Sequence, residues 1–145
     1  YLSLMSSAKE ILKKNGLKLT ENRRLILNQF ISKEYALSHN DIDCMIERKL
    51  DKVTIYRTLK SFEENGIIHE VVDGSSQIKY ALCNSDSCSS DDHHDSHIHF
   101  KCSDCEKTYC IDNVIIPSIK LPSEFQLESQ SVFIQGKCEK CKSPF

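Results

Sequence analysis

Two cysteine pairs near the C-terminus constrain the fold of this chain more than any other feature of its sequence. Two residues separate Cys102 from Cys105, and two separate Cys138 from Cys141. Such a gap lets both thiolates of a pair face one ion, and two pairs supply the tetrahedral sulfur shell that Zn²⁺ prefers. Thiolates are soft ligands, which disfavours Mg²⁺ and Ca²⁺. The spacing therefore predicts one shared zinc ion, with disulfides or a redox pair as the alternatives.

The predicted zinc site is structural, because sulfur fills all four positions and leaves none open for water. The 32 residues between the pairs exceed a zinc-ribbon gap, so we expect them to include strands of a small domain. Metal-bound cysteines are typical of a reducing cytosol. The sequence shows no apolar run long enough to span a bilayer and no signal-peptide pattern. We therefore expect a cytoplasmic protein without a membrane partner.

The first half of the sequence has the periodicity of short amphipathic helices. We expect one over residues 6–14 and others beginning after Thr20, Ser38 and Asp51, each of which can cap a helix N-terminus. Asn-Gly pairs end the first and the fourth of these helices. The apolar side chains of the fourth helix recur at helical spacing, at Ile55, Leu59 and Phe62.

A β-hairpin is predicted directly after the fourth helix. Residues 67–72 and 77–82 are rich in strand-forming side chains, and residues 73–76 (Asp-Gly-Ser-Ser) are a turn signal. Helices followed by a hairpin are the order of a winged helix-turn-helix, whose second motif helix enters the major groove of DNA. Residues 52–65 take that place here.

The predicted recognition helix carries the side chains that DNA contact needs. Arg57 can bind guanine or phosphate, Lys52 and Lys60 can neutralise phosphates, and Thr54 and Tyr56 offer hydroxyls and apolar contact. A polar helix face that is merely solvated is the alternative.

Composition divides the chain into two parts. Residues 1–66 hold 12 Lys and Arg against 9 Asp and Glu, whereas residues 67–145 hold 7 against 12. Residues 84–96 are polar and of low complexity, which is typical of a linker. We therefore expect an α+β protein with three segments: a winged-helix domain (1–83), a hinge (84–96) and a small α/β dimerisation domain (97–145).

The C-terminal domain is expected to contain three strands. These are predicted at 97–102, 107–111 and 131–136, with a short helix near 114–119, although Pro117 and Pro122 crowd that segment.

A second metal site is predicted at the hinge. His97 and His99 alternate on a strand and so face one side, while Cys83 ends the hairpin and His69 lies on its first strand. Together they can form a tetrahedral site of three nitrogens and one sulfur, which suits Zn²⁺. The alternatives are exposed histidines and a buried Cys83 that only packs.

Other cysteines and histidines have weaker claims on a metal. Cys88, His93 and His94 lie in the polar linker, where no fixed geometry is expected. Cys44 and Cys110 lie in regular patterns, and we expect them to pack.

Four stretches together resemble the ferric uptake regulator family, and within it most of all the zinc uptake regulator branch. They are residues 16–23, 53–59, 97–107 and 136–141, and the resemblance spans nearly the whole chain. It implies a homodimer in which each winged helix binds one half of a palindromic operator. It assigns Tyr56 and Arg57 to DNA reading.

The resemblance also assigns metal ligands. Cys102, Cys105, Cys138 and Cys141 match the family's structural zinc site, and His97 and His99 match a regulatory pair. Iron and peroxide sensors of the family use a histidine and carboxylates where this chain has Ala36, Ala81 and Cys110. Zinc sensors instead have ligands at the positions of His69 and Cys83.

The expected function is therefore a metal-responsive repressor with a structural zinc ion and a second, regulatory zinc ion, and it is not an enzyme. No small organic substrate is expected. An iron-responsive regulator, with Fe²⁺ in the second site, is the nearest alternative, and thiol or peroxide control is another. A zinc-containing protein-interaction module and a zinc enzyme are the rivals from other classes.

Overall fold

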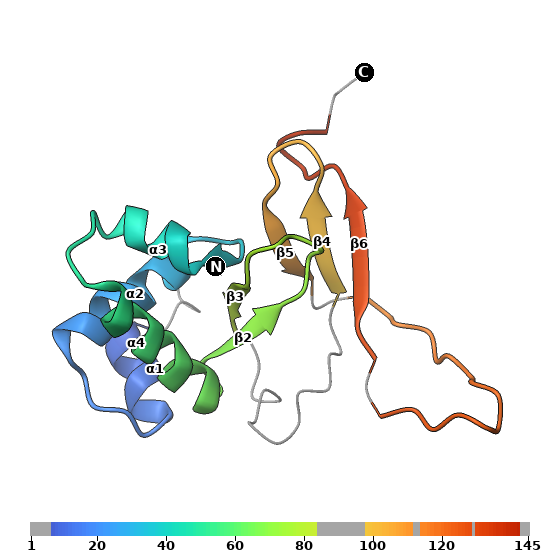
Figure 1. Ribbon diagram of the computed structural model, residues 1–145, viewed down its shortest axis with the longest axis horizontal. Helices are drawn as coiled ribbons and strands as arrows, with labels where there is room; N and C mark the ends of the chain where they lie inside the picture. The colour runs from blue at the N-terminus through green and yellow to red at the C-terminus, as the bar shows by residue number, and fades with distance from the viewer. Residues whose placement is uncertain (1–6, 84–97, 112–113, 129, 143–145) are drawn as a thin grey trace.

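The computed structural model describes residues 7–83, 98–111, 114–128 and 130–142. Within these ranges, four helices and a three-stranded sheet are followed by a second three-stranded sheet (Figure 1). The expected mixture of helices and sheets is confirmed. In the part of the chain that is described, no helix is long and apolar enough to cross a membrane.

Three of the four helices begin directly after the predicted capping residues, and the first begins two residues later than predicted. They are α1 (Ala8–Lys14), α2 (Glu21–Ser32), α3 (His39–Met45) and α4 (Lys52–Glu64). Ser7 and Ser38 each form a capping box with the acidic residue three positions on, and Thr20 accepts a hydrogen bond from the Arg23 N–H. Asp51 precedes α4 but caps no backbone N–H, because its carboxylate accepts from the Thr54 hydroxyl instead.

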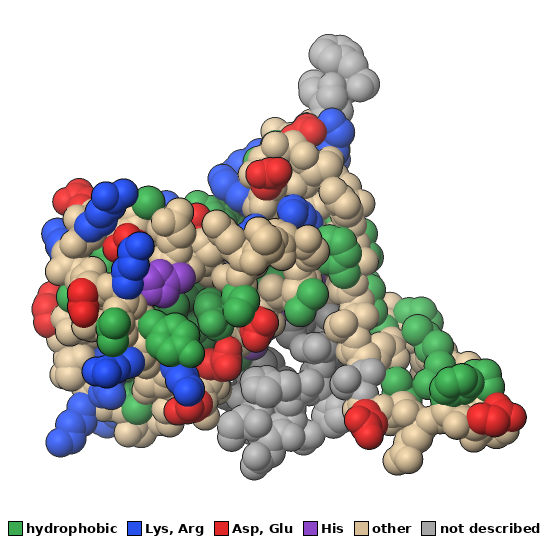
Figure 2. Space-filling model, in the orientation of Figure 1, with side chains coloured by type: hydrophobic (Ala, Val, Ile, Leu, Met, Phe, Trp, Pro, Cys, Tyr) green, Lys and Arg blue, Asp and Glu red, His purple; other side chains and the backbone are tan. Residues whose placement is uncertain are grey.

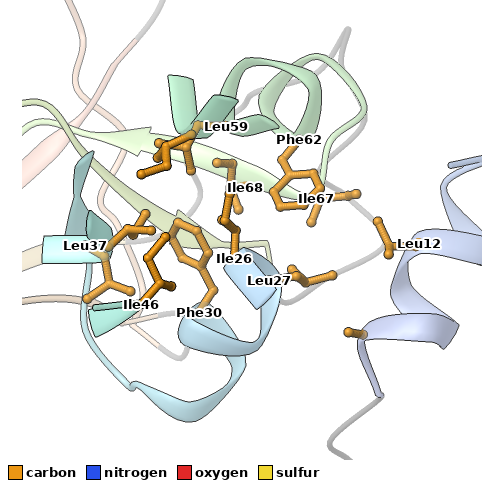
Figure 3. Close-up of a cluster of buried hydrophobic side chains, with 13 residues drawn as sticks. Leu12, Ile26, Leu27, Phe30, Leu37, Ile46, Leu59, Phe62, Ile67 and Ile68 are labelled. Carbon is orange, nitrogen blue, oxygen red and sulfur yellow. The ribbon is translucent and has the colours of Figure 1, made fainter. Parts of the chain in front are cut away.

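The helices enclose a hydrophobic core (Figure 3). Ile26, Leu27 and Phe30 of α2 face Ile55, Leu59 and Phe62 of α4, and all six are buried. Burial of each such side chain stabilises the fold by about 1.5–3 kcal/mol. Because one face of α4 is fixed in this core, its opposite face is directed to solvent.

The predicted hairpin pairs as an antiparallel sheet. Strand β2 (Ile68–Val71) pairs with β3 (Lys79–Leu82), and β1 (Leu37–Ser38) lies on the other side of β3. The hairpin of β2 and β3 follows α4 directly and forms the expected wing.

The second sheet contains the three strands expected in the C-terminal part. Its central strand β4 (Ile98–Cys102) runs antiparallel to β5 (Thr108–Ile111) and parallel to β6 (Val132–Gly136). The edge of this sheet at β5 lies beside the wing (Figure 1).

The expected helix near 114–119 is wrong. Residues 114–128 contain neither helix nor strand, and they loop away from both sheets (Figure 1). Pro117 and Pro122 lack the N–H groups that a helix would use. Apolar side chains of this segment are exposed, at Val114, Ile115, Ile119, Leu121, Phe125 and Leu127.

Candidate metal sites and DNA-binding surface

The four predicted zinc ligands lie together at one edge of the second sheet. The sulfur atoms of Cys102, Cys105, Cys138 and Cys141 all lie within 4.8 Å of one another. Cys102 pairs with Gly136 in the parallel register of β4 and β6. The two Cys-x-x-Cys turns, or knuckles, therefore leave the sheet side by side. The Sγ atoms of Cys105 and Cys138 are 3.8 Å apart. The predicted proximity of the four thiols is thus confirmed.

Backbone groups favour thiolate at this edge. Hydrogen bonds from the backbone of Cys105 and Cys138 lower the pKa of Cys102 to about 6, against the opposing effect of burial. Hydrogen bonds with the neighbouring sulfurs of Cys138 and Cys102 raise the pKa of Cys141, because they favour its protonated thiol, and burial and repulsion from the Cys102 charge raise it further. A cation would relieve that repulsion, so the donor set fits one tetrahedral zinc ion.

A second cluster of potential ligands lies where the wing meets the second sheet. Ligand atoms of His69 on β2, His99 on β4 and Cys110 on β5 all lie within 4.8 Å of one another. His99 is opposite Cys110 in the register of β4 and β5. The Nε2 atom of His69 is 3.3 Å from the Cys110 Sγ, and its ring stacks on that of His99 with 5.9 Å between centroids.

The imidazole of His69 lies between two thiols. Its Nδ1 atom is 3.4 Å from the Cys83 Sγ, whereas its Nε2 atom faces Cys110. Both histidine side chains are buried, with 7% of His69 and 4% of His99 exposed. Nitrogen and sulfur donors in such a buried position suit Zn²⁺.

Three members of the predicted second site are therefore brought together: His69, Cys83 and His99. His97 lies outside the described residues, as do Cys88, His93 and His94.

Sequence reasoning did not assign Cys110 to the second site, and left open whether it takes part in metal or redox sensing. It packs on Ala36, Val71 and Ala81, as expected, but its sulfur also faces the histidines. Its position gave a signal: it lies five residues after Cys105, where the resemblance implies a carboxylate in peroxide sensors. Packing was also expected of Cys44, and that expectation is wrong because Cys44 is exposed on α3.

The candidate DNA contacts lie on the outer faces of α4. Lys52, Tyr56, Arg57 and Lys60 are exposed and Thr54 is half-buried. Tyr56 exposes 58% of its surface, although it is a large aromatic side chain. Lys and Arg side chains are spread over the helical part of the molecule (Figure 2). Cations and an exposed aromatic ring on one helix are what a DNA backbone and groove would require.

Known proteins match this chain along most of its length. Ferric uptake regulation proteins of Staphylococcus epidermidis and Staphylococcus aureus are each 30% identical to it. The first alignment covers 94% of this chain and 95% of the relative, and the second 94% and 97%.

Solved structures share the fold. A structure described as a zinc uptake regulator complexed with zinc and DNA has a TM-score of 0.63 at 20% identity, covering 97% of this chain and 93% of that one. A ferric uptake regulator from Francisella tularensis with iron has a TM-score of 0.55 at 22% identity, covering 87% and 95%. The sequence pattern of the ferric uptake regulator family matches residues 14–141. The chain is therefore a member of the ferric uptake regulator family.

Proposed function

We propose that this metal-responsive transcription regulator is a zinc sensor, which represses its target genes when its second site is loaded. The observation that carries the proposal is the cluster of His69, His99 and Cys110, whose members come from both sheets. A site shared in this way ties the orientation of the wing to occupancy by metal. Members of the family are transcription regulators and not enzymes, which agrees with our expectation that this chain is not an enzyme.

The donor set supports zinc over iron. Imidazole nitrogen and thiolate sulfur are ligands that Zn²⁺ accepts readily, whereas carboxylate oxygens are absent from this cluster among the described residues. An Fe²⁺ sensor is the second candidate, because the relatives at 30% identity are named ferric uptake regulation proteins. The structural zinc ion is assigned to Cys102, Cys105, Cys138 and Cys141.

The residues of the second site hold two parts of the molecule together. Bound zinc would supply a cation that the imidazoles of His69 and His99 share with the Cys110 thiolate across the junction. His69 fixes strand β2 of the wing, and His99 and Cys110 fix β4 and β5 of the second sheet. Cys83 orients His69 from the other side of its ring. We call the arrangement in which the wing lies against the second sheet closed, and any arrangement in which it does not open. The shift of population from open to closed depends only on how much more tightly the closed arrangement holds metal.

DNA binding is assigned to α4. Arg57 and Tyr56 would read base edges, with Thr54 beside them, while Lys52 and Lys60 would contact phosphates. A homodimer would place two such helices about 34 Å apart, one turn of DNA, and so bind a palindromic operator.

A second copy of the chain is the expected partner of the exposed apolar surface. Phe133 and Ile134 of β6 are exposed, and so is the segment 114–127, where Ile115 has 93% of its surface open. Large apolar side chains that are exposed together favour a protein–protein interface. We accordingly assign residues 1–83 to DNA binding, 84–96 to the hinge and 97–145 to dimerisation.

Elemental analysis combined with a gel shift tests the proposal. We expect two zinc equivalents per chain, of which the more weakly held one controls operator affinity. His99→Ala and Cys110→Ala should keep one equivalent and lose the metal response. Cys44→Ala is the matched control, because this cysteine is exposed on α3. A normal zinc response in both site variants would refute the proposal, and a response to Fe²⁺ alone would favour the second candidate.

A further inference from the structure

A buried ionic cluster lies at the junction of the two sheets, apart from the histidines and cysteines. Its centre is Asp73 in the turn of the wing hairpin, which has only 3% of its surface exposed. The Oδ2 atom of Asp73 accepts hydrogen bonds from Lys79 Nζ and from Thr108 Oγ1, each at 2.8 Å. Its Oδ1 atom accepts from the Ser75 N–H at 2.9 Å.

This cluster connects the wing to the second sheet. Asp73 and Lys79 belong to the wing hairpin, whereas Thr108 is the first residue of β5 and is fully buried. Lys79 Nζ also donates to the backbone carbonyl of Glu106, 3.2 Å away. The backbone N–H of Ala36 donates to the carbonyl of Thr108 at 2.7 Å. The junction therefore has polar contacts of its own, none of which uses a proposed metal ligand.

Burial makes these contacts depend on each other. Moving a carboxylate out of water is costly unless charged and polar partners replace the water. Burial itself would raise the pKa of Asp73, but the hydrogen bonds from Lys79, Ser75 and Thr108 outweigh it and hold the pKa well below its usual value. The Thr108 hydroxyl reaches Asp73 only when the wing lies against β5.

We propose that Asp73, Lys79 and Thr108 form a latch that holds the wing against β5 in the absence of regulatory metal. The latch and the metal site then favour the same closed arrangement. This inference rests on the proposed function in one respect, since it takes the closed arrangement to be the one that metal selects. It implies that part of the population is already closed before the regulatory metal binds. A smaller difference in metal affinity between the closed and open arrangements is then sufficient for the switch.

Hydrogen exchange at the Ala36 amide tests the latch directly. That amide is bonded across the junction, whereas the Ile67 amide donates to the Phe62 carbonyl within the winged helix. The protein is loaded with zinc at the four-cysteine site and stripped of weaker metal, and Thr108→Val and Lys79→Met are compared with the parent chain. Thr58→Val is the matched control, because its hydroxyl donates to the Thr54 carbonyl inside α4.

Both latch variants should exchange the Ala36 amide faster, with the Ile67 amide unchanged. A lost hydrogen bond to a charged group corresponds to roughly a 10- to 100-fold change in the opening equilibrium. Thr58→Val should leave the Ala36 rate as it is. An unchanged Ala36 rate in both latch variants would overturn the latch, and so would an equal acceleration at Ile67. Because no DNA or regulatory metal is present, failure of the zinc-sensor proposal would not alter this result.

Discussion

Cobalt binding by variants of Cys83 and Cys110 gives the sharpest test of the second site. The ligand atoms that lie within 4.8 Å of one another belong to His69, His99 and Cys110, whereas Cys83 faces the other nitrogen of His69. One imidazole gives a single nitrogen to a given ion. We therefore expect Cys110 to bind the metal and Cys83 to orient the His69 ring.

Cys83→Ala and Cys110→Ala should differ in how much they weaken metal binding. Loss of a partner that orients a ligand weakens metal affinity by roughly 10- to 100-fold, which is about 1.4–2.7 kcal/mol. Loss of a direct ligand should exceed that. A fully switched protein has a ratio of closed to open molecules of about 99:1 when the site is loaded. If the loss in Cys83→Ala falls on the closed state, the loaded ratio drops to between about 10:1 and 1:1, so the variant should respond partially.

The assay is a Co²⁺ titration of protein whose four-cysteine site already holds zinc. A sulfur-to-cobalt charge-transfer band should appear in the parent chain, persist with weaker binding in Cys83→Ala, and vanish in Cys110→Ala. Cys44→Ala should match the parent. The reasoning is refuted if Cys83→Ala abolishes the band while Cys110→Ala retains it.

Three further predictions concern the surface, the core and the junction. Arg57→Ala should weaken operator binding by about 1–3 kcal/mol and leave thermal unfolding unchanged, as measured by gel shift and calorimetry; full operator affinity would exclude Arg57 from the contact. Phe62→Ala should lower the free energy of unfolding by about 3–5 kcal/mol in denaturant unfolding, because the side chain is fully buried. Phe125→Ala, at an exposed side chain, should instead weaken dimerisation, as measured by sedimentation. Equal effects of the two on unfolding would contradict the burial argument. Asp73 has a folded-state pKa below its unfolded value of 3.8, so its contribution to the junction is complete above pH 3.8 and is lost as pH falls below that value. Ala36 amide exchange, corrected for the intrinsic pH dependence of exchange, should therefore accelerate only in that acidic range, and an earlier loss near neutral pH would count against Asp73.

Local signals in the sequence were sufficient for much of the fold. Caps located the second and third helices, because Thr20 and Ser38 accept hydrogen bonds from N–H groups three residues further on. Periodicity and the closing Asn-Gly pair located the first helix. The four-cysteine cluster followed from spacing, since each knuckle is a local turn. The wing followed from its turn residues and strand-forming runs.

Features that depend on distant pairing were harder to predict. Cys110 joins the histidines only because β5 aligns with β4 and lies beside the wing, which no local pattern encodes. Asp73 was read as a turn residue, yet its carboxylate is committed to Thr108, 35 residues away. Asp51 had the composition of a cap but bonded the Thr54 hydroxyl instead.

Parallel alignment of β4 and β6 has a consequence for how the protein matures. The carboxyl ends of both strands lie at the same end of the sheet, which is why the two knuckles meet there. A slip of β6 by two residues would move Cys138 about 6.6 Å along its neighbour, too far to share one ion. Zinc binding thus selects the strand register, because only a sheet with the correct register brings all four thiols to one ion. The bound ion then stabilises that register.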